Sequence, residues 1–210
     1  MNHQKLFLIF LLSLPVFIVS PALNATAQTN DSAITYESTI SVKYFMQANA
    51  GIGIGLGYFK QNVINGYQVR LKNDELFYSI SAVNGVILNG RTGLGIGLGV
   101  QPWTDGLFFP VFLHAFYNLT PQENTFYGAT SLGYSIGTRY ETVHFESGSG
   151  GLMVGLAAGY KMIVTKRLKF ECEAFYNYQS VKSRYYFNAI LVDYTVPYHF
   201  AGFRIGIEFH

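Results

Sequence analysis

The stretch that decides the fold is RTGLGIGLGV, residues 91–100. Its apolar residues Leu94, Ile96, Leu98 and Val100 are separated by single glycines. Alternation with a period of two places these side chains on one face of a β-strand. Glycine weakens a strand interior, because it packs nothing and loses much conformational entropy on folding. The stretch therefore predicts a strand with one apolar face and one face without side chains. The fold must account for what each of these faces contacts.

The same alternation recurs along the chain. It is found in segments 51–59, 109–119, 151–162, 167–179 and 198–210. Segments of about ten residues have the length that a tilted strand needs to cross a bilayer. The pattern indicates an all-β chain built from strands with one apolar face each.

The connections between these strands alternate between short and long. Asn89-Gly90 is a type I′ hairpin signal, whereas long connections are expected at 99–108, 137–150 and 180–196. Short periplasmic turns and long outer loops are typical of a closed antiparallel up-and-down β-barrel. We expect eight strands if segment 38–71 contributes one strand and ten if it contributes three, and we prefer eight. The outer loops are predicted to carry Glu141, Glu146, Lys182, Arg184, Tyr185 and Tyr186.

Composition narrows the class of protein. The chain has 210 residues, of which 50% are hydrophobic and 12% charged, with a formal net charge of +2. A soluble domain averages about 25% charged residues, and we find no run of Lys or Arg that would bind nucleic acid. Residues 1–27 have a basic start, an apolar run and the small-x-small site Ala25-Thr26-Ala27, as in a cleaved signal peptide. We expect residues 28–37 to be a flexible segment and 38–210 to be the barrel.

An exported, apolar chain without a helical span is either a transmembrane barrel in the outer membrane or a secreted β protein. In a barrel, alternate side chains face lipid and lumen, so the glycines would face a crowded lumen. We predict that the lumen holds Lys161, Lys169, Glu171, Glu173, Arg204 and Glu208, a balanced set that pairs its charges into a plug. We predict that lipid contacts Leu94, Ile96, Leu98, Leu168, Phe170, Phe203, Ile205 and Ile207. Tyr117, Tyr160, Tyr176 and Tyr178 are candidates for aromatic girdles at the interfaces.

Four segments carry a resemblance to a known family: FFPVFLHAFYNLTP (108–121), FYGATSLGYSIG (126–137), GGLMVGLAAGYKM (150–162) and FAGFRIGIEF (200–209). The chain resembles the small outer-membrane β-barrel proteins of Bacteroidota, with a fold akin to OmpA-type and OmpX-type barrels, over about residues 75–210. The resemblance implies location and fold more than activity. It also implies that a terminal aromatic residue is read by the barrel-assembly machinery; here Phe209 is penultimate and His210 follows.

The sequence offers no catalytic signature, cofactor motif or metal-ligand spacing. His114 is predicted to face inward, Cys172 to face lipid, and no His-x-Ser arrangement of a lipid-modifying barrel is present. We therefore predict a non-enzymatic, porin-like integral protein of the outer membrane, monomeric, with a structural or surface-interaction role and an unknown surface ligand. Three alternatives stay open: a narrow pore, a lipid-modifying enzyme, and a secreted soluble barrel whose aliphatic face points inward around a hydrophobic ligand.

Overall fold

The computed structural model describes residues 40–62, 68–103, 106–122, 124–139, 145–187 and 190–210. Every regular element in these ranges is a β-strand. The strands are β1 (Val42–Gly55), β2 (Tyr58–Asn62), β3 (Gln68–Lys72), β4 (Leu76–Leu88), β5 (Thr92–Trp103), β6 (Gly106–Asn118), β7 (Thr125–Arg139), β8 (Phe145–Ser149), β9 (Gly151–Thr165), β10 (Leu168–Phe187) and β11 (Ile190–Phe209). Within the described ranges, no helix has the length and apolarity that a membrane crossing would need.

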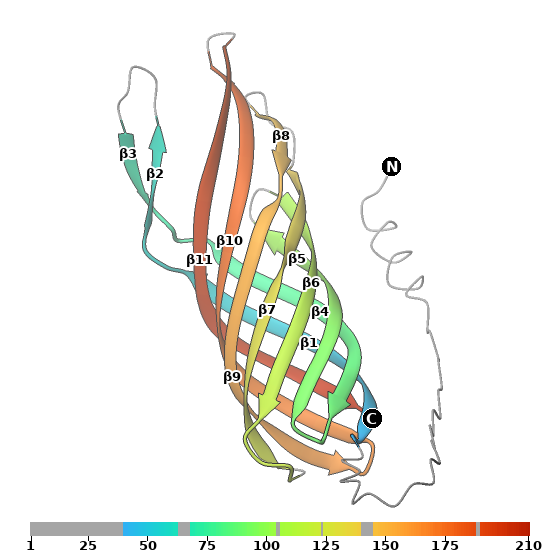
Figure 1. Cartoon of the computed structure of the whole chain (residues 1–210). Helices are drawn as coiled ribbons and strands as arrows, with labels where there is room; N and C mark the ends of the chain where they lie inside the picture. The colour runs from blue at the N-terminus through green and yellow to red at the C-terminus, as the bar shows by residue number, and fades with distance from the viewer. Residues whose placement is uncertain (1–39, 63–67, 104–105, 123, 140–144, 188–189) are drawn as a thin grey trace, which may run out of the picture. The chain divides into compact units, whose positions relative to one another are not determined.

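Eight of these strands form a closed antiparallel barrel. They are hydrogen-bonded in the order β11-β1-β4-β5-β6-β7-β9-β10, and β10 pairs with β11 to complete the ring. Figure 1 shows the strands wrapping around one axis at a marked tilt. The prediction of an all-β, eight-stranded barrel is confirmed.

The segment that made the strand count ambiguous contributes one strand to the barrel. β1 pairs with β11 and β4, whereas β2 and β3 pair only with each other as a separate hairpin. The base of this hairpin is tied to the barrel, because Asn73 donates from Nδ2 to the carbonyl oxygen of His199 at 2.8 Å. The leading prediction of eight strands therefore holds, with an additional hairpin outside the barrel wall.

The two ends of the barrel differ in the length of their connections. At one end, which we call the short-turn end, β4, β6 and β9 turn directly into the next strand, and β11 ends at Phe209. In the first of these turns, Asn89 and Gly90 have φ angles of 52° and 68°, the positive values that a type I′ turn requires. The opposite end, the long-connection end, carries β2, β3, β8 and the outer parts of β10 and β11 (Figure 1).

Two long connections predicted from the sequence are in fact mostly strand. Residues 180–187 lie in β10 and residues 190–196 in β11, and the two strands pair from Leu168↔Phe209 to Phe187↔Ile190. Segment 99–108 is divided between β5 and β6, which pair through Trp103↔Gly106. The sequence in these segments lacks strict apolar alternation, and the strands continue because each backbone finds a complete hydrogen-bonding partner beside it.

The bare face of β5 is occupied by aromatic rings from the next strand. In the β5–β6 register, Gly93 lies opposite Phe116 and Gly97 lies opposite Phe112. A Cβ atom on either glycine would overlap the facing phenylalanine ring. Both rings are buried, at 3% and 8% exposure. Glycine is therefore needed in β5 because the rings of β6 lie across its backbone.

The interior of the barrel is filled with side chains in two clusters. The long-end aromatic cluster consists of Phe77, Trp103, Phe108, Phe175, Val181, Val196, Tyr198 and Phe200. The short-end aromatic cluster consists of Phe45, Val83, Ile87, Phe112, Phe116, Tyr127 and Met153. We expected interior residues to be small or charged. The expectation missed the aromatic clusters, which are accommodated where facing strands present glycine.

Candidate functional site

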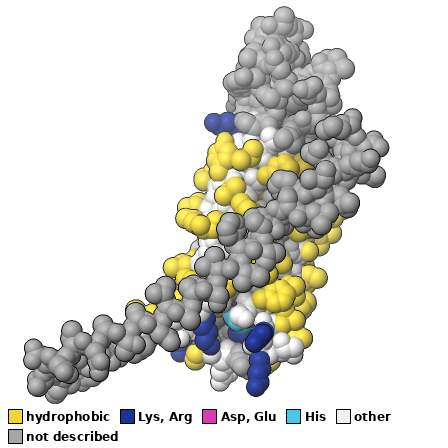
Figure 2. Space-filling view, turned by 90° about the vertical axis from the view of Figure 1, so that its right-hand side faces the viewer, with side chains coloured by type: hydrophobic (Ala, Val, Ile, Leu, Met, Phe, Trp, Pro, Cys, Tyr) yellow, Lys and Arg dark blue, Asp and Glu magenta, His cyan; other side chains and the backbone are white. Residues whose placement is uncertain are grey.

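The outer surface of the barrel is a continuous apolar surface. Leu113, Ile96 and Phe203 are 62%, 61% and 69% exposed. Among the described residues, the outward positions carry no Asp, Glu, Lys or Arg in the following ranges: 42–54, 76–88, 94–102, 107–119, 126–136, 152–164, 168–178 and 199–209. In Figure 2, hydrophobic side chains cover most of the visible wall of the described barrel. We call this band the outer apolar surface.

Several polar groups on the outer apolar surface have local partners. The Tyr44 hydroxyl donates to Asn84 Oδ1 at 2.6 Å, and the Thr130 hydroxyl donates to the Gly155 carbonyl oxygen at 3.2 Å. The hydroxyl of Tyr176 lies 2.6 Å from His199 Nδ1. Pairing of this kind lowers the cost of placing polar atoms in an apolar environment.

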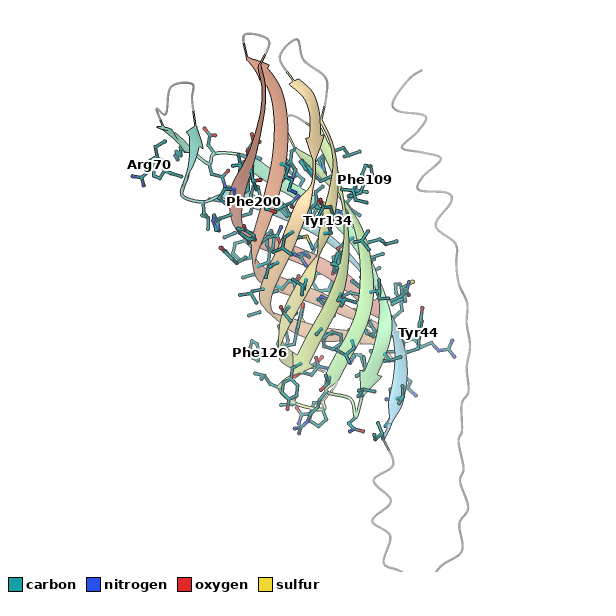
Figure 3. All side chains as sticks on the ribbon, turned by 45° about the horizontal axis from the view of Figure 1, so that its top comes forward. Tyr44, Arg70, Phe109, Phe126, Tyr134 and Phe200 are labelled. Atoms are coloured by element: carbon teal, nitrogen blue, oxygen red, sulfur yellow. The ribbon has the colours of Figure 1, made fainter. Side chains whose placement is uncertain are left out.

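Large aromatic residues lie near both ends of the barrel wall. In Figure 3, Tyr44 and Phe126 lie toward the short-turn end, and Phe109 and Tyr134 toward the other end. Phe126 is 64% exposed and its ring packs 4.7 Å from that of Tyr160. Exposed aromatic residues at two levels are typical of the interfaces of membrane barrels.

Inside the barrel, near the short-turn end, a lysine is enclosed by two carboxylates. The Lys161 ammonium lies 2.9 Å from Glu171 Oε1 and also pairs with Glu208. Gln47 donates from Nε2 to the other oxygen of Glu171, and Phe116 presents its ring 3.5 Å from the ammonium. The side chains of Lys161 and the two glutamates are at most 1% exposed. We call Lys161, Glu171, Glu208 and Gln47 the lysine cluster.

A second ion pair lies further inside the barrel. Arg204 Nη1 is 2.9 Å from Glu173 Oε1, and the Tyr127 hydroxyl donates to the second oxygen of Glu173 at 2.8 Å. The guanidinium of Arg204 lies 4.8 Å from the Phe175 ring. On β1, Gly51 is opposite Arg204, and its missing side chain makes room for the arginine stem.

Between the two aromatic clusters lies a polar layer with very little free space. Its cavities measure about 30 and 10 Å³, enough for roughly two water molecules and one. Arg204, Ser131 and Gly155 line both of them. Buried polar atoms face this layer without a partner among the described residues, including Gln101 Oε1, Asn177 Nδ2 and His114 Nε2. Because such atoms are usually satisfied by buried water, the layer is suited to hold individual water molecules.

Five of the six predicted lumen charges take part in the ion pairs described above. Lys161, Glu171 and Glu208 belong to the lysine cluster, and Arg204 pairs with Glu173. Lys169 is half-buried near the short-turn end and lies opposite Glu208 in the β10–β11 register. Gln47, Tyr127 and the ring of Phe116 complete the network, and only their inward strand parity pointed to them in the sequence. His210 Nε2, 3.0 Å from Glu208 Oε1, was not anticipated.

The predicted lipid-facing residues all lie on the outside of the barrel wall. Leu94, Leu98, Ile205 and Ile207 are 38–54% exposed, while Leu168 and Phe170 are half-buried close to the short-turn end. Cys172 is also exposed on this surface. The alternative in which the aliphatic face points inward around a ligand is therefore wrong, because the inward positions are glycine, aromatic and charged.

The predicted outer-loop residues do not lie on loops where the structure describes them. Lys182, Arg184, Tyr185 and Tyr186 belong to β10, and Glu146 belongs to β8. Glu141 lies outside the described residues. Phe209 is 37% exposed at the end of β11. In the part of the chain that the structure describes, no group of three or more His, Cys, Asp or Glu side chains is arranged to hold a metal ion.

The fold is similar to that of solved outer-membrane proteins. Neisserial surface protein A (NspA) superposes with a TM-score of 0.52 at 13% identity, over 80% of this chain and 98% of that one. Outer membrane protein AlkL, determined in lipid bilayers, gives a TM-score of 0.52 at 11% identity, over 88% and 95%. Outer membrane protease OmpT from Escherichia coli gives a lower TM-score of 0.42 at 8% identity, over 79% and 96%. No protein-family model and no curated protein matches the chain. The likenesses to NspA and AlkL show that the closed antiparallel barrel is a fold that these outer-membrane proteins share.

Proposed function

We propose that this chain is an integral outer-membrane protein whose outer apolar surface contacts lipid, with a non-enzymatic structural or surface-interaction role. The observation that carries the proposal is the outer apolar surface, uncharged over the described ranges given above, around an interior that holds the lysine cluster and the Arg204–Glu173 pair. A soluble monomer rarely exposes so large a continuous apolar surface to water, whereas a membrane barrel presents such a surface to the acyl chains of the bilayer. The fold likeness to NspA and AlkL supports the same environment.

The proposal includes a plugged lumen. The lysine cluster packs against the short-end aromatic cluster through Phe116 and Tyr127, and the two cavities described above measure only about 30 and 10 Å³. A hydrated ion passing through would have to displace buried, paired charges and packed rings. We therefore expect no conduction in the resting protein.

Several finer features of the proposal rest on the sequence. They are cleavage after residue 27, export to the outer membrane, assembly through the penultimate Phe209, a monomeric state, and membership of the Bacteroidota type of barrel protein. Residues 1–27 lie outside the described residues. Mass spectrometry of the protein recovered from membranes tests the cleavage directly, since a chain that retains residues 1–27 would contradict it.

Membrane insertion is tested by sodium carbonate extraction together with gel mobility before and after heating. A closed membrane barrel should stay with the carbonate-washed membrane, and the unheated sample should migrate differently from the boiled one. Recovery of the chain as a dissolved monomer without detergent would overturn the proposal. The same preparation tests the plug in planar bilayers, where discrete single-channel steps would contradict a sealed lumen.

The non-enzymatic assignment is tested separately. Spectra of lipid A from cells with and without the protein should be identical. A mass change that depends on expression would show that the barrel modifies lipid and would replace this part of the proposal.

A further inference from the structure

Basic residues gather at the short-turn end of the barrel. Lys43, Arg91, Lys166 and Arg167 are all exposed there. None of them forms an ion pair with another residue that the structure describes. In Figure 2, dark blue side chains lie at the lower end of the described barrel, below the yellow wall. We call these four residues the basic rim.

The basic rim borders the outer apolar surface directly. Lys43 lies between Val42 and Tyr44, which are 58% and 44% exposed. Lys166 and Arg167 follow Val164, which is 59% exposed. Long basic side chains beside an apolar wall can lay their methylene stems along it and hold their charges at the level of the lipid headgroups.

Arg91 joins the rim through the turn between β4 and β5. Its carbonyl oxygen accepts a hydrogen bond of 2.8 Å from the Asn118 backbone, which places Arg91 beside Leu119, 62% exposed. The four cations therefore come from three separate places on the circumference, the start of β1 and two of the turns. These places adjoin one another on one side of the barrel, since the β9–β10 turn bonds to His210 after β11, β11 pairs with β1, and the β4–β5 turn bonds to Ser41 before β1.

The two ends of the barrel differ in charge. The three turns at the short-turn end contain Arg91, Lys166 and Arg167 and one acidic residue, Glu123. The segments toward the long-connection end, which include β2, β3, β8 and the outer parts of β10 and β11, are 56–75, 104–105, 139–150 and 180–196, and they contain six basic and six acidic residues. The basic excess therefore belongs to the short-turn end, where these side chains are exposed.

We propose that the basic rim binds the phosphate headgroups of anionic phospholipids in the leaflet that meets the short-turn end. The inference rests on the proposed function, because it requires the outer apolar surface to lie in a bilayer. A lipid leaflet supplies acyl chains and phosphates at adjoining levels, which matches the outer apolar surface with the basic rim at its edge. Guanidinium and ammonium groups donate charge-assisted hydrogen bonds to phosphate oxygens. Each basic residue near an anionic membrane surface strengthens binding by about five-fold.

The test measures lipid selectivity in reconstituted vesicles. The full chain is refolded into phosphatidylcholine vesicles that contain a trace of spin-labelled phosphatidylglycerol or spin-labelled phosphatidylcholine. The fraction of each label that is motionally restricted by the protein gives the ratio of their association constants. We expect the wild type to prefer phosphatidylglycerol severalfold, and we expect 0.5 M salt to reduce the preference because it screens exposed charges.

A matched pair of variants assigns the preference to the rim. Lys43→Gln, Arg91→Gln, Lys166→Gln and Arg167→Gln together should bring the ratio close to one. Lys72→Gln with Lys182→Gln removes exposed cations at the other end and should leave the ratio unchanged. Each preparation is first checked for heat-modifiable gel mobility, so that only folded barrels are compared.

The outcomes separate this inference from the proposed function. A wild-type ratio near one, or a preference that survives the four-fold rim variant, would overturn the lipid inference while the barrel still inserts. Binding of the folded protein to isolated peptidoglycan that is lost in the rim variant, without lipid preference, would assign the rim to a cell-wall partner and overturn it also. Failure of the wild type to insert into any vesicle would instead overturn the proposed function.

Discussion

Ile205→Arg tests whether lipid or water surrounds the barrel wall near the middle of the outer apolar surface. Ile205 lies on the outward face of β11 and is 53% exposed. Its neighbours in the adjoining strands are Ala50 and Cys172. The wild-type side chain therefore contributes little to packing inside the barrel, and the effect of the variant reports mainly on the surrounding medium.

The position of Ile205 along β11 sets the expected magnitude. Ile205 is four residues from Phe209 at the short-turn end, or ~13 Å along a strand that rises ~3.3 Å per residue. With a strand tilt of ~40°, this corresponds to a depth of ~10 Å in an apolar band ~25 Å tall. Arginine near the middle of such a band costs about 2–4 kcal/mol.

A matched control lies on the same face of the same strand. Thr195 is exposed and lies ten residues beyond Ile205, ~33 Å further along the strand at the same rise, which places it outside the apolar band. Thr195→Arg should therefore cost roughly 0–1 kcal/mol.

The assay is urea unfolding in phosphatidylcholine vesicles, followed by the loss of the folded band on unheated gels. The Ile205→Arg midpoint should fall well below those of the wild type and Thr195→Arg. If the two arginine variants are equally stable, the wall is not embedded at this depth and the assignment of the outer apolar surface to lipid is refuted.

Two further predictions concern the interior and use the same urea assay. Lys161→Met leaves Glu171 and Glu208 buried without the Lys161 ammonium and should destabilise the barrel by about 3–5 kcal/mol. Adding Glu171→Gln and Glu208→Gln to this variant should recover most of the lost stability. If Lys161→Met alone leaves the urea midpoint unchanged, the plug of paired charges is contradicted. Gly97→Val places a branched side chain where the Phe112 ring lies and should cost about 1–3 kcal/mol. Phe112→Ala combined with Gly97→Val should be less damaging than the sum of the two single changes, whereas strict additivity would argue against their contact.

The pairing of the charges inside the barrel could be predicted from the sequence only in part. Alternation alone placed Lys161, Glu171 and Glu208 on the inward faces of their strands, and a balanced set suggested pairing. Their actual partners depend on the register in which β9, β10 and β11 meet, with Lys161 opposite Glu171. Gln47 enters the cluster from β1, which joins β11 only when the barrel closes. Such partners cannot be read from local periodicity, because each belongs to a distant segment of the chain.

The sequence by itself determined which side chains face outward and which face inward, because side-chain direction alternates along a strand regardless of what lies beside it. It also determined the type I′ turn at Asn89-Gly90, because asparagine and glycine adopt positive φ angles more readily than other residues. Only the tertiary structure decided that β2 and β3 lie outside the barrel, that β10 and β11 continue through segment 180–196, and that the glycines of β5 receive the rings of β6. These features depend on hydrogen-bond partners and facing surfaces that exist only once the eight strands have closed on one another.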